Sequence, residues 1–342
     1  MSKKNLKFAV IGCSGMAKRH MEGVKLAEGA ELYVICDTAP ERLEDAKKEL
    51  GCERAVTDYM EIVNDPEVDA AVVVTPDQIH CEMVCNLLRA GKAVMCEKPM
   101  ALTMEECEEM MRVERETNGK LMVGQICRFT PGFLAAKQLV DEGRIGELTF
   151  VESEYAHNYT NARGYGDWRV TPERPGFLGG GCHAVDLLRW IAGDPREITA
   201  YSNRKTMLDW PTDDNTIAIM KFDDNVIGKV FVSTGCKRNY TMRSVFYGTK
   251  GTIICDNRSD TIQLFEDNAE LGLTYHDAPQ QIPVEINNHN ATAEIKTFVD
   301  ALVKGEAMPI PSYEGANTVA VCCAALESAK TGRPVEVKYP TV

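Results

Sequence analysis

Short apolar segments alternate with helical ones along the first third of the chain, and this alternation constrains the fold more than any other feature. Apolar runs predict strands at residues 8–11, 31–36, 70–74 and 93–96. Helical patterns fill residues 40–50 and 79–90, and Thr103 and Glu106 have the spacing of a capping box that begins a helix through about residue 117. Because strands covered on both faces are apolar throughout, this pattern predicts an α/β fold with a doubly wound parallel sheet.

The apolar pattern changes after a predicted strand at residues 121–123 and a helix at 131–142. Longer alternating segments then predict mainly antiparallel strands at residues 148–157, 198–203, 216–222, 226–234, 241–247, 252–255 and 261–265. Two further helices are expected at 292–304 and 313–330. The length of 342 residues favours two domains, and we place a dinucleotide-binding domain at 1–125 and a substrate domain at 126–342.

Charge and composition exclude several classes of protein. The chain has 51 acidic and 38 basic residues, a formal net charge of −13, which disfavours nucleic acid and anionic membrane surfaces as partners. It has no apolar stretch of roughly 18 residues and no signal-peptide pattern, so we expect a cytoplasmic protein with no membrane contact. The 13 cysteines have irregular spacing without a C-x-x-C pair, which predicts reduced buried thiols and no metal site.

A glycine-containing loop directly follows the first predicted strand. Gly12, Ser14 and Ala17 occupy the three small positions of a G-x-G-x-x-G/A loop, although Ser14 departs from the second glycine. The loop continues through Gly15 and Met16 into a helical stretch. Unpaired N–H groups at a helix N-terminus bind anions, so these five residues are predicted to hold the pyrophosphate of a dinucleotide.

An acidic residue at the end of the second strand supports this interpretation. Asp37 lies 25 positions after Gly12. In dinucleotide-binding folds a carboxylate at about this spacing binds the ribose hydroxyls of adenosine. Its charge would repel a 2′-phosphate, so we predict NAD rather than NADP as the cofactor. The alternative is that Asp37 only caps the helix that begins at Pro40.

Two further groups of residues suggest chemistry. Lys98 follows the fourth predicted strand, at the edge where open α/β sheets bind ligands, although many lysines are simply solvated. His183 follows a run of three glycines and lies three residues before Asp186, so the two side chains share one face of a helix. A histidine that only satisfies buried backbone groups is the alternative for His183.

Several ordered motifs together resemble the Gfo/Idh/MocA family, that of glucose–fructose oxidoreductase and inositol dehydrogenase. They are Ala9-Val10-Ile11-Gly12 with His20, Thr75-Pro76 with His80, Glu97-Lys98-Pro99, Trp168-Arg169, the glycine run before His183-x-x-Asp186, and Tyr247-Gly248-Thr249-Lys250-Gly251. The resemblance implies an N-terminal Rossmann domain and a C-terminal α/β domain with an open, mainly antiparallel sheet. It also implies hydride transfer between NAD(P) and a sugar or cyclitol, and a homo-oligomer, as a dimer, tetramer or hexamer, formed through the open sheet.

The resemblance also assigns roles to particular residues. Lys98 matches the family's active-site lysine and His183 its acid/base histidine, while Gly179 stands where polyol-oxidising relatives often carry an Asp. Any Asp–His relay must therefore be absent or rebuilt by Asp186. Further cofactor contacts are expected at Thr75, Pro76, His80, Glu97, Lys98, Arg128, Trp168 and Arg169.

Some of these residues have structural alternatives, and a second group is expected at the substrate. His80 could instead be an exposed residue at a helix start, and Arg128 could form a structural salt bridge. Expected substrate contacts are Lys98, Asp186, Tyr155, His157 and Arg163, a mixture of aromatic and hydrogen-bonding side chains suited to a sugar.

The leading functional prediction is an NAD-dependent dehydrogenase of a sugar, glycoside or cyclitol ring hydroxyl, most specifically C3 of a glycoside. One alternative is a redox-neutral lyase or hydrolase that uses tightly bound NAD. Another is a reductase of keto-sugars. A non-enzymatic nucleotide sensor is disfavoured because it would not need both Lys98 and His183.

Overall fold

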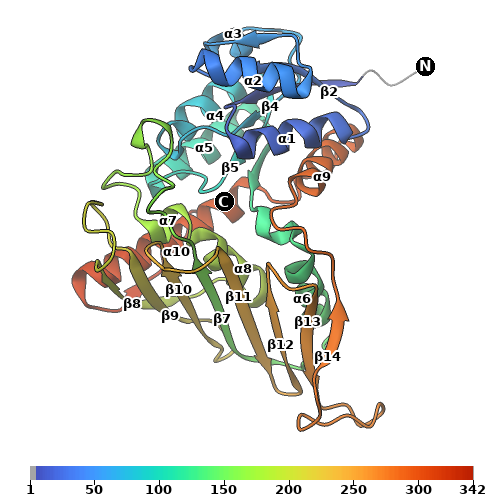
Figure 1. Ribbon diagram of the computed structural model, residues 1–342, viewed down its shortest axis with the longest axis vertical. Helices are drawn as coiled ribbons and strands as arrows, with labels where there is room; N and C mark the ends of the chain where they lie inside the picture. Colours follow the sequence, from blue (N-terminus) through green and yellow to red (C-terminus); the bar gives the residue numbers. More distant parts are fainter. Residues whose placement is uncertain (1–4, 342) are drawn as a thin grey trace. The chain divides into compact units, whose positions relative to one another are not determined.

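The computed structural model describes residues 5–341, and the chain divides into two compact units (Figure 1). The first contains the chain up to Gln125, Asn290–Ala316 and the end of the chain from Pro340, and the second contains Ile126–His289 and Asn317–Tyr339. The change of unit at residue 125 lies where the sequence pattern changes. The return of residues 290–316 to the first unit differs from the expected domain of residues 126–342.

The first unit is built on a six-stranded parallel sheet in the order β3-β2-β1-β4-β5-β6. Its strands are β1 (Leu6–Ile11), β2 (Ala30–Cys36), β3 (Ala55–Val56), β4 (Ala70–Val73), β5 (Ala93–Glu97) and β6 (Leu121–Gly124). Its helices are α1 (Gly15–Leu26), α2 (Pro40–Leu50), α3 (Met60–Val63), α4 (His80–Arg89), α5 (Met104–Thr117) and α9 (Ala291–Lys304). This strand order is that of a Rossmann fold, as predicted.

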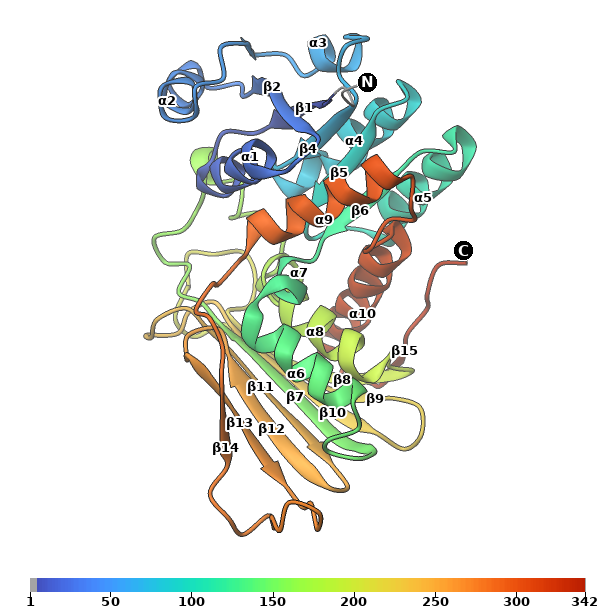
Figure 2. The same ribbon diagram turned by 90° about the vertical axis from the view of Figure 1, so that its right-hand side faces the viewer.

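Local sequence signals account for two of these helices. The Thr103 hydroxyl accepts from the Glu106 N–H at 3.2 Å, and the Glu106 carboxylate accepts from the Thr103 N–H at 3.2 Å, so the capping box is present. Helix α9 packs against α1, where a Cβ on Gly23 would lie 3.1 Å from Ile295 (Figure 2). The edge of the Phe298 ring also meets Phe8 of β1, at 6.0 Å between centroids. These contacts place α9 in the first unit.

The second unit contains a nine-stranded, mainly antiparallel sheet in the order β14-β13-β12-β11-β7-β10-β9-β8-β15. Its strands are β7 (Leu148–Ala156), β8 (Glu197–Asn203), β9 (Asn215–Lys221), β10 (Ile227–Ser233), β11 (Thr241–Gly248), β12 (Gly251–Asp256), β13 (Thr261–Glu266), β14 (Gln280–Pro283) and β15 (Val335–Glu336). Its helices include α6 (Pro131–Asp141), α7 (Gly176–Gly179) and α8 (Cys182–Ala192); α10 (Ser312–Thr331) enters this unit at Asn317. Strands β7 and β10 pair in parallel at the centre.

Helices cover one face of this sheet and leave apolar side chains exposed on the other. Helices α6 and α8 lie along the covered face (Figure 2). Exposure alternates along β9, where Ile217 and Ile219 are exposed while Ala218 and Met220 are buried. The predicted α/β fold with an open, mainly antiparallel second sheet is therefore confirmed. Among the described residues, no helix combines the length and apolarity needed to span a membrane.

Candidate active site

The loop after β1 has the geometry that a dinucleotide phosphate requires. Gly12 has φ = +106°, and a Cβ there would lie 2.4 Å from the carbonyl oxygen of Val74, so only glycine fits. Ser14 is the N-cap of α1, but its hydroxyl makes no capping hydrogen bond. The N–H groups of the first turn of α1 therefore receive no side-chain oxygen from the N-cap, which suits an anion at this helix end.

The Asp37 carboxylate lies against the same loop. It accepts hydrogen bonds from the N–H of Cys13 at 2.8 Å and of Ala39 at 2.9 Å, and it pairs with Arg42 at 2.6 Å. The N-cap of α2 is Ala39, so the alternative role of Asp37 as that cap is not what the structure shows. A carboxylate held beside the glycine loop fits the adenosine ribose of NAD.

His80 joins two loops at the carboxyl edge of the parallel sheet. It begins α4, directly after the 3₁₀ helix η1 (Asp77–Ile79), and has no exposed surface. Its Nε2 lies 3.1 Å from the carbonyl oxygen of Thr75, and its Nδ1 lies 3.0 Å from that of Pro99. The alternative of an exposed helix-start residue is therefore wrong, and His80 instead holds the Thr75–Pro76 loop against the segment that carries Lys98.

Lys98 is half-buried. The residue before it, Glu97, belongs to a buried cluster of ionisable groups with His20 and Glu294. Glu97 accepts from the Lys98 N–H at 3.0 Å and lies 2.7 Å from Nε2 of His20. Burial alone would raise the pKa of Glu97, but the hydrogen bond with His20 and the charge of Lys98 lower it to about 2. Glu97 is therefore the ionised member of the cluster and places a negative charge beside Lys98.

Glu294 of α9 is the other acid of this cluster and was not predicted from the sequence. Its side chain is fully buried, and neither carboxyl oxygen has a hydrogen-bond partner among the described residues. Burial, followed by the negative charge of Glu97, raises the pKa of Glu294 well above its ordinary value of 4.5. Folded protein therefore keeps a proton on Glu294 that the unfolded chain releases.

The free energy of unfolding of Glu294→Gln is expected to exceed that of the wild type by an amount that increases as pH rises. Above pH 4.5 the unfolded state binds fewer protons than the folded state, so wild-type stability falls with pH until the raised pKa is passed. The limiting slope for one group is about 1.4 kcal/mol per pH unit. Urea unfolding of both proteins at pH 5 and pH 7 measures this difference. Glu306→Gln, at an exposed residue just after α9, is the control, and a difference between Glu294→Gln and wild type that does not change with pH contradicts the assignment.

His183 lies in the second unit within a cluster of rings. It belongs to the first turn of α8, is 3% exposed, and stacks on Tyr155 with centroids 5.9 Å apart. Tyr155 bonds through its hydroxyl to Nδ1 of His157 at 3.0 Å and to the hydroxyl of Tyr159 at 2.8 Å. Burial raises the pKa of Tyr155 and of Tyr240, so both phenols stay protonated at neutral pH.

Asp186 forms a buried ion pair with Arg128. Its carboxylate accepts two hydrogen bonds from Arg128, at 2.9 and 2.7 Å, and one from Thr318 at 3.2 Å. Asp186 is fully buried and Arg128 is 9% exposed. This pair agrees with the alternative of a structural salt bridge for Arg128. The expected contacts of Asp186 with substrate and of Arg128 with the cofactor stay predictions.

The position of the missing aspartate is filled by an arginine. A Cβ on Gly179 would lie 2.3 Å from the Arg174 guanidinium, which donates to the Gly179 carbonyl oxygen at 3.2 Å. The guanidinium groups of Arg174 and Arg169 lie over the Trp168 ring, at 4.6 and 4.3 Å from its centroid. The Arg163 carbonyl oxygen accepts from the Arg169 N–H at 3.1 Å, while the Arg163 side chain forms exposed pairs with Asp167 and Asp209.

Three side chains near His183 were not singled out as site residues from the sequence. Cys127 places its Sγ 3.3 Å from Nδ1 of His183, and His289 stacks on His183 with centroids 5.5 Å apart. The Tyr240 hydroxyl lies 3.2 Å from Nε2 of His289. No periodicity or short spacing connects these residues, so only the fold could reveal them.

Comparison with known proteins identifies the family. Residues 6–125 match the oxidoreductase family with an NAD-binding Rossmann fold, GFO_IDH_MocA, and residues 133–254 match the GFO/IDH/MocA C-terminal domain. The chain belongs to the Gfo/Idh/MocA family. It is thus an NAD-dependent oxidoreductase, and the Gly12 loop and Asp37 fit that cofactor.

Named relatives of this Gfo/Idh/MocA protein are similar over almost their whole length. Myo-inositol 2-dehydrogenase of Thermotoga maritima is 26% identical over 97% of this chain and 99% of its own. The 1,5-anhydro-D-fructose reductase of Ensifer adhaerens is 29% identical over 97% of this chain and 98% of its own. Levoglucosan dehydrogenase in complex with NADH and levoglucosan shares the fold, with a TM-score of 0.88, 22% identity, and coverage of 98% of this chain and 100% of that one.

Proposed function

We propose that this protein oxidises a ring hydroxyl of a sugar, glycoside or cyclitol with NAD⁺, and that C3 of a glycoside is the preferred position. The observation that carries the proposal is His183 among the rings of Tyr155, His157 and Tyr240, in a chain of this NAD-dependent family. Aromatic faces pack against the C–H groups of a sugar ring, while phenol and imidazole groups bind its hydroxyls. The named cyclitol and sugar relatives support this substrate class.

Oxidation of a secondary alcohol separates a proton from a hydride. Bound NAD⁺ supplies the acceptor for the hydride that leaves the ring carbon. We assign His183 to accept the hydroxyl proton, because a neutral imidazole does this near pH 7. We assign Lys98 to hold the hydroxyl oxygen and to stabilise the negative charge that develops on it.

Cys127 is placed to orient the His183 ring. The Cys127 thiol donates to Sδ of Met242 at 3.4 Å, so its sulfur can accept the proton on Nδ1 of His183 at 3.3 Å. This arrangement leaves Nε2 of His183 unprotonated and able to act as the base. We therefore assign Cys127 as a positioning residue for His183.

The reverse reaction is the second candidate, because one of the more similar relatives is named a reductase. The same residues would then supply a proton to the carbonyl oxygen of a keto-sugar, while its carbonyl carbon receives hydride from NADH. A redox-neutral lyase or hydrolase would use the oxidised sugar only as an intermediate.

We also propose a cytoplasmic homo-oligomer that buries the exposed face of the nine-stranded sheet. This face presents Tyr201, Ile217, Ile219, Ile227 and Tyr247 to solvent, and exposed apolar patches commonly mark protein interfaces. All thirteen cysteines carry free thiols, which fits a reducing compartment.

The test of the proposed reaction is the absorbance of NADH as the protein and NAD⁺ are offered free sugars, cyclitols and aryl glycosides, with NADP⁺ alongside. We expect NADH and a keto-sugar in equal amounts from one substrate class, and a much smaller signal with NADP⁺. A cleaved product without NADH would favour the redox-neutral reaction. Activity only with keto-sugars and NADH would favour the reductase.

A further inference from the structure

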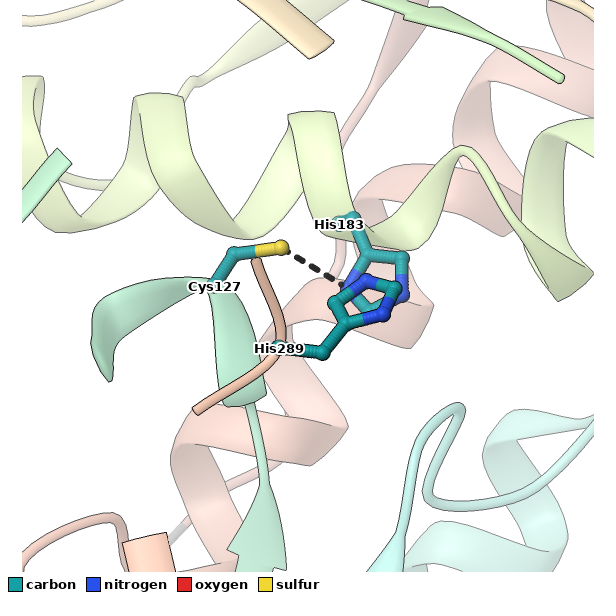
Figure 3. A group of neighbouring side chains, drawn as sticks. All are labelled: Cys127, His183 and His289. Carbon is teal, nitrogen blue, oxygen red and sulfur yellow. Dashed lines mark hydrogen bonds between the residues drawn. The ribbon is translucent and has the colours of Figure 1, made fainter. Parts of the chain in front are cut away.

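Three metal-ligating side chains from separate segments meet inside the second unit (Figure 3). Cys127 lies in the 3₁₀ helix η2 (Ile126–Phe129), His183 in α8, and His289 in the segment before α9. One ligand atom of each lies within 4.8 Å of those of the other two. Cys127 and His183 are 2% and 3% exposed, while His289 is half-buried. The cluster is therefore largely shielded from solvent and partly open at His289.

The geometry suits a small tetrahedral cation. Metal–sulfur and metal–nitrogen bonds of about 2.3 and 2.1 Å at a tetrahedral angle place sulfur and nitrogen about 3.6 Å apart. The observed separation of Cys127 Sγ and His183 Nδ1 is 3.3 Å. A thiolate with two imidazoles selects zinc or a similar transition metal over magnesium and calcium, which prefer oxygen ligands.

Neighbouring groups hold both histidines in place. The Tyr240 hydroxyl lies 3.2 Å from Nε2 of His289 and helps to fix the orientation of that ring. The His183 ring stacks on both the Tyr155 ring and the His289 ring, with interplanar angles of 26° and 27°. Metal-binding histidines are usually fixed by such contacts, which set the ring orientation.

We propose that Cys127, His183 and His289 form a binding site for Zn²⁺ and that the bound metal holds the oxidoreductase inactive. Three protein ligands leave a fourth position for water. Binding replaces the thiol proton of Cys127, which is released to solvent, so affinity for the metal increases with pH. The C-x-x-C spacing absent from the sequence is not needed, because the fold brings the ligands together.

The inactivation follows from the chemistry of the imidazole and rests on the proposed function. The nitrogen of His183 that faces Cys127 is Nδ1. A neutral imidazole that binds a metal through Nδ1 carries its proton on Nε2. That nitrogen can then no longer accept the proton of a substrate hydroxyl, so the metal and the reaction compete for His183.

Binding is tested with Co²⁺, which reports thiolate coordination by absorbance. Reduced, metal-depleted full-length protein is titrated with CoCl₂, and we expect a sulfur-to-cobalt charge-transfer band that saturates at one Co²⁺ per chain and disappears on adding Zn²⁺. Cys127→Ser should abolish the band, and His289→Gln should weaken Co²⁺ affinity at least tenfold. The matched controls Cys236→Ser and His276→Gln, at residues outside the cluster, should bind as wild type does.

The outcomes separate this site from the proposed function. Absence of the band in wild type, or its persistence in Cys127→Ser, overturns the metal site. If Cys127→Ser does not fold, a Co²⁺ affinity of His289→Gln equal to that of the wild type overturns it. For activity, the rate of each variant with Zn²⁺ is compared with its own rate without metal. Zn²⁺ should abolish NADH formation by the wild type, and EDTA should restore it. A rate unchanged or increased by bound Zn²⁺ overturns the inactivation. A saturating band in a protein that oxidises no sugar leaves the metal site standing and rejects the proposed reaction.

Discussion

Replacing Lys98 by methionine is expected to lower turnover by a factor of about 10² to 10⁴. This is the loss expected when a group that stabilises charge in the transition state is removed. Methionine keeps an unbranched side chain but removes the ammonium group, whose charge helps to lower the pKa of Glu97. Affinity for NAD⁺ should change little, because the Gly12 loop and Asp37 lie on other elements of the Rossmann unit. Steady-state kinetics give the loss in turnover, and a thermal shift with NAD⁺ gives the affinity.

The control for Lys98→Met is Lys120→Met, which removes an exposed lysine from the same unit. Its turnover should equal that of the wild type. Wild-type turnover in Lys98→Met would contradict the assignment of Lys98 as the residue that holds the reacting oxygen. A large loss of NAD⁺ affinity would instead make Lys98 a cofactor ligand.

Replacing Asp186 by alanine is expected to destabilise the second unit by about 3 to 5 kcal/mol. The change leaves the Arg128 guanidinium, which is 9% exposed, without its bidentate partner. Breaking one side of a buried pair costs more than removing both sides. The double variant Arg128→Met/Asp186→Ala should therefore recover part of the loss. Urea unfolding measures all three proteins.

Asp300→Ala provides the comparison for Asp186→Ala, because it removes one partner of an exposed i,i+4 pair with Lys296. Such pairs contribute about 0 to 1 kcal/mol. An Asp186→Ala protein with wild-type stability but a large increase in KM would return Asp186 to the substrate site and reject its structural role.

Local signals in the sequence predicted most elements of the fold. The capping box at Thr103 and the proline at the start of α2 mark helix starts that the structure reproduces. Strands as short as β3 and β15, with two residues each, have no periodicity to detect. The parallel pairing of β7 with β10 and the packing of α9 on α1 depend on contacts between distant segments.

The same distinction applies to the candidate site. Gly12 and Asp37 were predictable because a short loop and a fixed spacing define a dinucleotide site. Cys127 contacts a histidine 56 residues away, and no residue near it in the sequence indicates that partner. The spacing of Asp186 from His183 likewise gave no indication of its buried ion pair with Arg128, which lies 58 residues away in the sequence.

The most direct test of the central claim follows deuterium from the sugar to the nicotinamide. A substrate found in the absorbance panel is prepared with deuterium on the ring carbon that becomes the ketone, and the reduced cofactor is analysed by mass spectrometry. The account predicts one deuterium per NADH, because the hydride passes directly from that carbon to the nicotinamide. Product formation with no deuterium in the recovered cofactor would contradict it.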